Sequence, residues 1–306
     1  MLSRVADAVF WMARYMERTD NVVRALRTNY IASQDELQNF DWQMWVEGLG
    51  GTAQEQKTVS SYREALQHLI INKENDTSVL INIVRARENA RSVQDYITKE
   101  LWQCMNDYYH LVREAHTEYL ILHGDPVTAF DNLLRESTLF YGTVDITMNR
   151  GEGYTFLNIG KYIERLLRSL DFLELKIKEL ELGGNEVTQW KYLLYSLSGY
   201  EFHTKYYRNV LSTENVLHQV IMNVQFPHSV FYCLSQVERY FKRLDAISVP
   251  EHFKEMEFLL GRAISTLRYN GPEQKSVEQV KGLVANTRTE IKGLSQKLAT
   301  LYFGYS

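Results

Sequence analysis

The chain has 306 residues, of which 45% are hydrophobic and 24% are charged, and its formal net charge is −4. This composition supports a full hydrophobic core and excludes an intrinsically disordered chain. Because the charge is slightly negative and forms no long runs of one sign, a dedicated nucleic-acid-binding protein is excluded as well. Length alone allows either two ordinary domains or one large domain.

The sequence predicts a cytoplasmic protein that does not bind membranes. Its first residues include Arg4 and Asp7 and contain no apolar run before a cleavage site, so we expect no signal peptide. No stretch approaches the roughly 20 apolar residues of a membrane-spanning helix. Cys104 and Cys233 are far apart in helical patterns and are interpreted as two reduced core thiols rather than a disulfide.

Helical periodicity dominates the chain from end to end. The chain has only 4 prolines, and no segment shows a convincing strand alternation. Ser3 is a suitable N-cap for the first helix, and Gly183-Gly184 is a suitable stop for the second long helix. The predicted helices cover, approximately, residues 3–35, 41–49, 59–71, 78–104, 108–123, 126–149, 154–181, 186–198, 201–210, 214–223 and 229–244, one further segment before Asn270, and a final one from Val277 to Leu301.

A five-residue motif occurs in both long helices, as Arg14-Tyr15-Met16-Glu17-Arg18 and, 147 positions later, as Lys161-Tyr162-Ile163-Glu164-Arg165. The apolar positions around both copies keep the same spacing of three and four residues over several turns. Adjacent residues of a helix point in different directions, so the Glu and the Arg of each copy need separate partners.

The motif indicates two duplicated helical halves, pseudo-repeats 1–150 and 154–306. A weaker similarity exists between Ser78-Val79-Leu80 and Ser229-Val230-Phe231. No counterpart is evident for the part of the chain after Leu244. The segment between the halves is too short for a flexible tether, so we expect one all-α globular multi-helix bundle that spans residues 1–306.

Four segments resemble the alpha-E family, predicted helical proteins named for a Glu-Arg helix motif. They are Met1–Arg4 leading into Trp11–Arg18, then Ala86–Arg91, Lys161–Arg165 and Pro227–Val230. The chain has His228 where the family pattern has Arg beside the proline. Proteins of this family look like non-catalytic or uncharacterised bacterial partners of ATP-grasp ligases, so the resemblance implies such a partner role, and it supplies no active-site residues.

Sequence motifs for known chemistry are missing. We find no Gly-rich phosphate loop, nucleophile elbow, His-Glu-x-x-His motif or close cysteine pair, and we predict no cofactor. His110, Glu114 and Glu118 share one face of the predicted helix 108–123, which makes a metal site conceivable. A solvated helix face is the favoured interpretation, and we predict no bound metal.

Three charged stripes are the candidate binding site. One interpretation is structural: Arg and Glu side chains form a partly buried ionic network that fixes the helix register. The other is an anion site in which arginines converge on a carboxylate or phosphate beside a glutamate of shifted pKa. We favour the structural interpretation. The candidate residues are Arg14, Glu17, Arg18, Arg85, Arg87, Glu88, Arg91, Lys161, Glu164, Arg165 and Arg168.

We therefore expect a non-catalytic accessory or scaffold protein that acts with an ATP-grasp-type, amide-bond-forming peptide ligase. The alternative is an enzyme or small-ligand binder of the same system that holds a carboxylate or phosphate in the Arg/Glu cluster. A solvent-open, concave cluster favours the alternative. A cluster sealed between helices, together with a separate aromatic surface patch, favours the scaffold.

A pseudo-twofold arrangement of the halves makes a further prediction about the repeated motif. Symmetry then pairs Glu17 with Arg165 and Arg18 with Glu164, so that each contact is returned by the other half. The competing arrangement keeps local, exposed pairs within each helix, Arg14 with Glu17 and Glu164 with Arg168.

Overall fold

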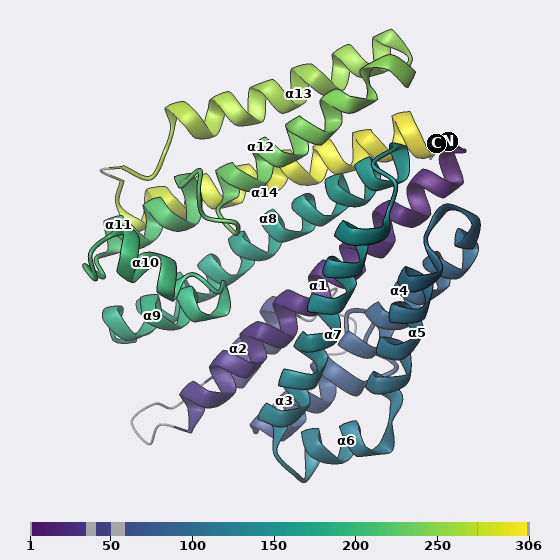
Figure 1. Cartoon of the computed structure of the whole chain (residues 1–306). Coiled ribbons are helices and arrows are strands. Elements are labelled where there is room, and N and C mark those ends of the chain that lie inside the picture. Colours follow the sequence, from purple (N-terminus) through teal and green to yellow (C-terminus); the bar gives the residue numbers. More distant parts are fainter. Residues whose placement is uncertain (1, 35–40, 50–58, 274, 305–306) are drawn as a thin grey trace. The chain divides into compact units, whose positions relative to one another are not determined.

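The computed structural model describes the chain except residues 1, 35–40, 50–58, 274 and 305–306 (Figure 1). Within these limits every regular element is a helical segment and no strand is present, so the all-α prediction is confirmed. The chain divides into two compact units, one of residues Trp11–Asn149 and one of residues Met1–Phe10 with Arg150–Ser306. The first turns of helix α1 (Ser3–Ser33) thus belong with the C-terminal half of the chain.

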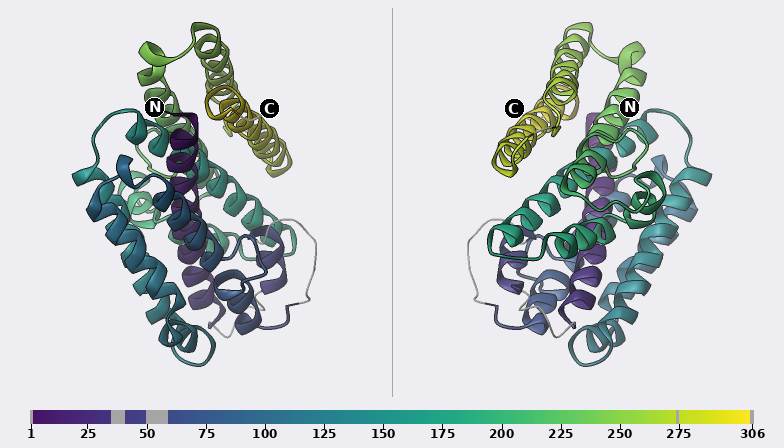
Figure 2. Two further views of the ribbon diagram at one scale, coloured as in Figure 1. Left: turned by 90° about the vertical axis from the view of Figure 1, so that its right-hand side faces the viewer. Right: turned by 90° about the vertical axis from the view of Figure 1, so that its left-hand side faces the viewer.

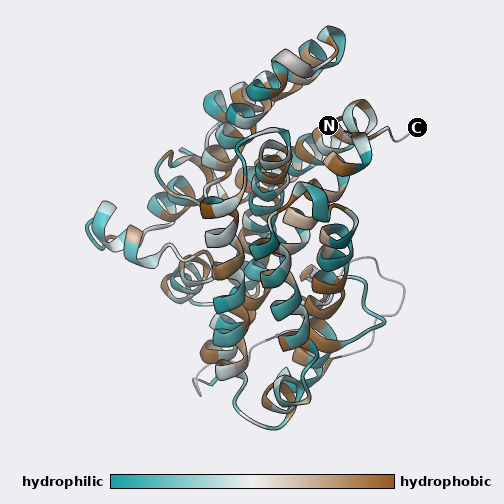
Figure 3. Ribbon diagram, turned by 45° about the vertical axis from the view of Figure 1, so that its right-hand side comes forward, coloured by the Kyte–Doolittle hydropathy of each residue, from teal (hydrophilic) through white to brown (hydrophobic). Residues whose placement is uncertain are grey.

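The unit Trp11–Asn149 contains most of α1 and a layer of antiparallel helices. Helix α5 packs against both α4 and α7, and α6 packs beside α7. Figure 3 shows that hydrophobic and hydrophilic residues alternate along these helices, as expected when one face of each is buried. Its further elements are α2 (Trp42–Leu49), α3 (Tyr62–Leu66), η1 (Gln67–Ile71), α4 (Val79–Ser92), η2 (Gln94–Tyr96), α5 (Lys99–Arg113), α6 (Ala115–Leu122) and α7 (Pro126–Thr147).

The unit of Met1–Phe10 and Arg150–Ser306 is organised around the long helix α8. Helix α8 packs against α12 and α14, and α13 packs against the same two helices, which gives a ring of four (Figure 2). Three short helices, α9 to α11, lie at one end of α8 (Figure 1). Its elements are α8 (Glu152–Glu181), α9 (Glu186–Ser196), α10 (Tyr200–Tyr206), α11 (Thr213–Leu217), η3 (His218–Met222), α12 (Val230–Phe241), η4 (Lys242–Ile247), α13 (Pro250–Tyr269), α14 (Val277–Leu298) and η5 (Ala299–Phe303).

Two predicted helices are wrong, and local backbone chemistry explains both errors. The predicted helix 78–104 ends at Ser92, because Val93 leaves the helical region and the Thr98 side chain caps a new helix, α5. The predicted helix 108–123 is broken at Glu114, whose backbone is extended between α5 and α6. Neither break contains the glycine or proline that normally marks a helix end in a sequence.

A short π-helical turn precedes a capped helix in each unit. In one unit η1 is followed by Asn72 and by α4 with its N-cap Ser78, whose hydroxyl donates to the Asn72 carbonyl at 2.7 Å. In the other, η3 is followed by Asn223 and by α12 with its N-cap Ser229, whose hydroxyl donates to the Asn223 carbonyl at 2.6 Å. These elements lie 151 positions apart in the sequence.

The correspondence continues into the C-terminal segment. Helices α7 and α14 both have 22 residues, and their starting residues Pro126 and Val277 are again 151 positions apart. Each is capped by a side chain, from Asp125 in α7 and from Ser276 in α14. Helix α14 lies in the part of the chain after Leu244, for which the sequence shows no evident counterpart, and it matches α7 in length and in the spacing of its first residue.

Close packing at one glycine joins α8 to the first turns of α1. A Cβ atom built on Gly160 would lie 2.4 Å from the backbone carbonyl oxygen of Phe10. The Phe10 ring contacts the Phe303 ring, with a centroid separation of 5.1 Å. Residues from the start and the end of the chain therefore complete the core of this unit around α8.

None of the helices that the structure describes has the length and hydrophobicity needed to cross a membrane.

Candidate functional site

Glu17, the glutamate of the first motif copy, is fully buried and hydrogen-bonded. Its Oε1 atom accepts from Asn21 Nδ2 at 2.9 Å, one helical turn further along α1. Its Oε2 atom accepts from the hydroxyl of Tyr141 on α7. A buried carboxylate needs such donors, because leaving its charge without compensation costs several kcal/mol, on the order of 3–5. These contacts tie α1 to α7 within one unit.

The arginines of the first motif copy lie over aromatic rings of the same helix. The Arg18 guanidinium is 5.7 Å from the centre of the Tyr15 ring, and that of Arg14 is 4.5 Å from the Trp11 ring. The Trp11 and Tyr15 rings themselves are 5.6 Å apart. Cations at such distances from ring faces are attracted by the ring quadrupole. The Glu and the Arg of the motif thus have separate surroundings, as the helix spacing predicts.

The second motif copy repeats this local pattern. Glu164 is fully buried, and its Oε1 lies 3.3 Å from the Nε of Arg168, again one helical turn further along. Arg165 lies over the Tyr162 ring at 5.5 Å, and Lys161 approaches the same ring at 5.1 Å. In the local Glu164–Arg168 pair Glu164 is thus buried and Arg168 is 17% exposed, whereas the sequence predicted an exposed pair.

The buried pair continues into an ionic network between α8 and α14. Arg168 Nη2 lies 3.1 Å from Asp171, Arg288 Nη2 lies 2.9 Å from the same carboxylate, and Arg288 also pairs with Glu174. Burial raises the pKa of Asp171 above its usual value, while the two guanidiniums oppose this rise. Sequence reasoning missed these partners, although Asp171 lies three residues after Arg168, a spacing that brings side chains together on a helix.

The third predicted stripe, on α4, is divided between two faces. Arg85 pairs with Asp76, in the turn before α4, at 2.5 Å. Arg87 and Arg91 both contact Glu88, at 3.1 Å and 2.6 Å. Arg87 also donates to Asn106 on α5 at 2.8 Å. These partners belong to α4, α5 and the preceding turn, so the stripe forms its own surface cluster.

His110, part of the conceivable metal site, and His228, the departure from the family pattern, lie in unlike surroundings. His110 is exposed near the end of α5, and the backbone break at Glu114 removes the continuous helix face on which the conceivable metal site depends. The residues with described positions contain no group of three or more His, Cys, Asp or Glu side chains suited to a metal ion. His228 precedes the N-cap of α12, and its carbonyl accepts from Ser169 at 2.8 Å. The Ser229 side chain caps that helix.

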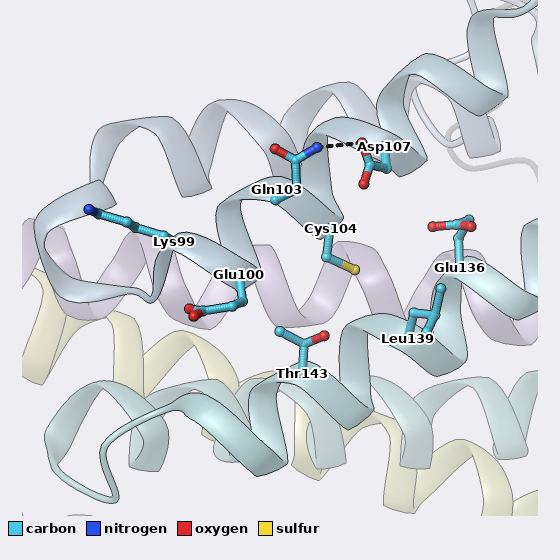
Figure 4. Close-up of a pocket in the computed structure, with 8 residues that line it drawn as sticks. All are labelled: Lys99, Glu100, Gln103, Cys104, Asp107, Glu136, Leu139 and Thr143. Carbon is cyan, nitrogen blue, oxygen red and sulfur yellow. Dashed lines mark hydrogen bonds between the residues drawn. The ribbon is translucent and has the colours of Figure 1, made fainter.

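A shallow groove runs between α5 and α7 (Figure 4). Its volume is about 480 Å³, and it contains the Cys104 thiol. Burial, reinforced by the charges of Glu136 and Asp107, raises the pKa of this thiol to about 11. The thiol therefore stays protonated and unreactive at neutral pH. The lining residues are Lys99, Glu100, Gln103, Cys104, Asp107, Glu136, Leu139 and Thr143.

An aromatic patch that the sequence analysis did not single out lies at the end of α9 and on α10. Its rings stack in pairs: Tyr195 with Tyr200 at 4.5 Å, and Phe202 with Tyr206 at 5.1 Å. The exposed fractions of Tyr195 and Tyr206 are 41% and 49%. We call Tyr195, Tyr200, Phe202, Tyr206 and Tyr207 the α10 patch.

The backbone on both sides of the α10 patch is strained. Ser198 before α10 has a φ of 54°, and Arg208 and Asn209 after it have φ values of 51° and 62°. Residues other than glycine rarely adopt this left-handed region, and it persists only where surrounding contacts impose it. Such strain is enriched at functional segments. The sequence signal was the density of aromatic residues in this segment, which does not by itself reveal exposure.

Buried polar contacts impose the conformation of α10. His203 is buried, and its ring nitrogens contact Gln219 Oε1 at 2.7 Å and the Val210 carbonyl at 3.1 Å. The Tyr207 hydroxyl lies 2.7 Å from His218 Nδ1 and accepts from Asn223 at 3.0 Å. Burial raises the pKa of Tyr207, so its hydroxyl stays protonated at neutral pH. The α10 patch is thus held rigidly on η3.

Comparison with known proteins identifies one family. A family model described as a predicted alpha-helical domain with a conserved ER motif matches residues 1–303. No curated protein and no solved structure matches the chain. The two Glu-Arg pairs described above, Glu17-Arg18 and Glu164-Arg165, are occurrences of such a motif, and the match covers nearly the whole chain, so the protein belongs to the alpha-E family.

Proposed function

We propose that this protein is a non-catalytic accessory or scaffold subunit that works with an ATP-grasp-type, amide-bond-forming peptide ligase. The observation that carries the proposal is the α10 patch, a group of partly exposed and mutually stacked aromatic rings. Tyrosine is enriched among the residues that dominate protein–protein binding. The kind of partner comes from the alpha-E resemblance.

The burial of the two motif glutamates favours this proposal over an enzyme or small-ligand binder. Glu17 and Glu164 have no exposed surface, and each faces a donor one helical turn away. A ligand-binding or catalytic carboxylate needs access to a pocket. The motif therefore acts within the fold, which leaves surface patches as the candidates for function.

A cytoplasmic location belongs to the same proposal, because a partner that consumes ATP works where ATP is supplied. The proposal does not require the protein to bind a cofactor, a metal or a nucleic acid.

Capture of the native partner tests the proposal. The tagged full-length chain is expressed in its native host, and retained proteins are identified by mass spectrometry and then purified for a reconstituted binding assay. The test variant is Tyr195→Ser with Tyr206→Ser. The control is Tyr269→Ser, which changes a tyrosine of the same unit that is 80% exposed but lies on α13.

We expect the wild type and the control to bind an ATP-grasp-type ligase, and the double variant to bind it at least about tenfold more weakly. Equal binding by all three would show that the α10 patch is not the contact surface. Amide-bond formation by the purified chain alone would refute the non-catalytic role itself.

We also propose that the two units arose by duplication of one helical half. The proposal is supported by the repeated motif, by the π-turns that precede Ser78 and Ser229, and by the equal lengths of α7 and α14. An experimental structure tests it: the five segments α3, η1, α4, α5 and α7 should superpose in order on α11, η3, α12, α13 and α14. Superposition of only one or two segments would point to chance similarity between helical bundles.

A further inference from the structure

A cluster of arginines and aromatic rings lies on one face of α4 and α5. The Arg87 guanidinium is 5.3 Å from the ring centre of Trp102 and 4.5 Å from that of Tyr109. The Arg113 guanidinium is 4.9 Å from the same Tyr109 ring and donates to its hydroxyl. Arg91 lies one turn beyond Arg87 on α4. We call Arg87, Arg91, Trp102, Tyr109 and Arg113 the arginine face.

Arg87 is fixed in orientation before any partner arrives. Its Nε donates to Asn106 Oδ1 at 2.8 Å, and its Nη1 donates to Glu88 Oε1 at 3.1 Å. A guanidinium has five donor hydrogens, so these two bonds leave about three for another acceptor. Its side chain is still 23% exposed. A cation held in this way loses little conformational entropy when it binds, which favours affinity.

The arginine face concentrates positive charge on a chain whose net charge is −4. The Arg91 side chain is 64% exposed, which is more than that of Arg87, and Arg113 is exposed at the end of α5. The carboxylate placed against Arg87 and Arg91 is that of Glu88, and it contacts both. Asp107, also on α5, accepts instead from Gln103 and lines the groove between α5 and α7. Among the described residues, no carboxylate other than Glu88 lies within ion-pair distance of these three guanidiniums, so positive charge exceeds negative charge on the arginine face.

The shape of this face indicates the kind of anion. Trp102 and Arg113 are eleven positions apart on α5, which corresponds to about 16 Å along a helix that rises 1.5 Å per residue. A single phosphate spans only part of that length. An extended peptide rises about 3.3 Å per residue, so a segment of roughly five residues matches it.

Two observations favour a protein segment over a nucleic acid. The face of the Tyr109 ring already carries the guanidiniums of Arg87 and Arg113, so it is not open for stacking by a base. The partly exposed edges of Trp102 and Tyr109 offer apolar contact beside the charges, as at the centres of protein–protein interfaces.

We propose that the arginine face binds an acidic, extended segment of a protein partner. The inference rests on the proposed function in one respect, that the partner is a protein. Carboxylates of the segment accept from Arg87, Arg91 and Arg113, and its apolar side chains lie against Trp102 and Tyr109. The contact is a docking contact, without a chemical step, and it is separate from the α10 patch.

Binding of a labelled oligoglutamate peptide to the full-length chain, measured by fluorescence anisotropy, tests this inference. The test variant is Arg91→Glu with Arg113→Glu, two exposed positions whose substitution leaves the core intact. The matched control is Arg85→Glu, which is on the same helix α4 but pairs with Asp76 on another face. We expect the test variant to bind at least about tenfold more weakly than the wild type, and the control to stay within about twofold.

Two further arms separate the possible anions. Binding of oligoglutamate should weaken as salt rises, because exposed charges are screened. Inorganic tripolyphosphate and single-stranded DNA serve as competitors, and each should compete less well than unlabelled oligoglutamate at equal charge. Equal binding by wild type and test variant, or stronger competition by either polyanion, would overturn the inference.

The outcome is distinguishable from failure of the proposed function. If the test variant still captures the ligase but no longer binds oligoglutamate, the arginine face recognises an anion that is not part of that partner, and the inference is wrong while the proposed function stands. Loss of ligase capture by both the α10 variant and the arginine-face variant supports both proposals. Circular dichroism and urea unfolding of each variant exclude loss of fold as the cause.

Discussion

The contact between Gly160 and Phe10 predicts opposite results for the same substitution at two glycines. A Cβ atom at Gly160 would approach the Phe10 carbonyl oxygen to 2.4 Å and the Phe10 ring to 3.1 Å. The oxygen belongs to the backbone of α1, so it cannot turn away as a side chain would. A Cβ atom at Gly293, in the middle of α14 in the same unit, would meet nothing within 4 Å.

The expected magnitudes follow from overpacking and helix propensity. Alanine is favoured over glycine in a helix by about 1 kcal/mol, so Gly293→Ala should raise the free energy of unfolding by about 0.5–1 kcal/mol. At Gly160 the same gain is opposed by displacement of α1, and overpacking of this kind costs about 1–3 kcal/mol or more. We therefore expect Gly160→Ala to lower the free energy of unfolding by about 1–2 kcal/mol.

Urea unfolding followed by circular dichroism measures both changes. With a slope of about 2 kcal/mol per molar urea, the midpoint should fall by roughly 0.5–1 M for Gly160→Ala and rise by roughly 0.25–0.5 M for Gly293→Ala. If both substitutions raised the midpoint, the close approach of α1 to α8 would be refuted.

Three further predictions concern buried polar groups. Tyr141→Phe removes a hydroxyl donor from the buried Glu17 carboxylate, so thermal unfolding should show a loss of about 1.5–3 kcal/mol, against less than about 0.5 kcal/mol for the exposed Tyr119→Phe. Lys176 is buried, and its Nζ lies 2.6 Å from Glu179. Burial lowers the pKa of Lys176 in the folded state, so the unfolded chain binds the lysine proton more tightly. The free energy of unfolding therefore rises with pH as the pH approaches the ordinary lysine pKa. Lys176→Met should remove that rise in urea titrations at several pH values, and it should lower the free energy of unfolding at neutral pH because it leaves the Glu179 carboxylate without its cation. The pairing of Glu17 with Arg165 stays a prediction: each alanine variant should lower the free energy of unfolding by about 3–5 kcal/mol, and a double-mutant cycle that proved fully additive would leave the pairing without support.

Local rules predicted much of the fold and the separation of the motif side chains. Helix spacing alone requires Glu17 and Arg18 to have different neighbours, and the structure places Asn21 beside one and Tyr15 beside the other. The contact of Glu17 with Tyr141 was beyond such rules, because it joins residues 124 positions apart. Pairings of that kind depend on how helices pack, which no single-sequence period records.

Exposure was the second quantity that the sequence did not supply. Tyr195 and Tyr206 lie in helical sequence patterns, as the buried Tyr108 does. The exposed fractions of Tyr195 and Tyr206 are nevertheless 41% and 49%, whereas that of Tyr108 is 0%. For Tyr206 the reason is that α10 is a short helix held by the buried contact of His203 with Gln219, and spacing over so few turns does not define an inner face. The sequence also did not predict the break between α4 and α5, because Thr98 caps α5 without a glycine or proline to mark the helix end.

The burial of the motif makes the cause of any lost function separable by experiment. Because Glu17 and Glu164 are enclosed by neighbours, substituting them should act on stability first and on partner binding only through loss of fold. Tyr206 and Arg113 are exposed, so their substitution should leave stability within about 0.5 kcal/mol and act on binding directly. A conserved motif and a functional surface need not coincide in this family. Variants of the Glu-Arg motif that lose activity are therefore interpretable only when their unfolding free energies are measured alongside those of the exposed aromatic and arginine variants.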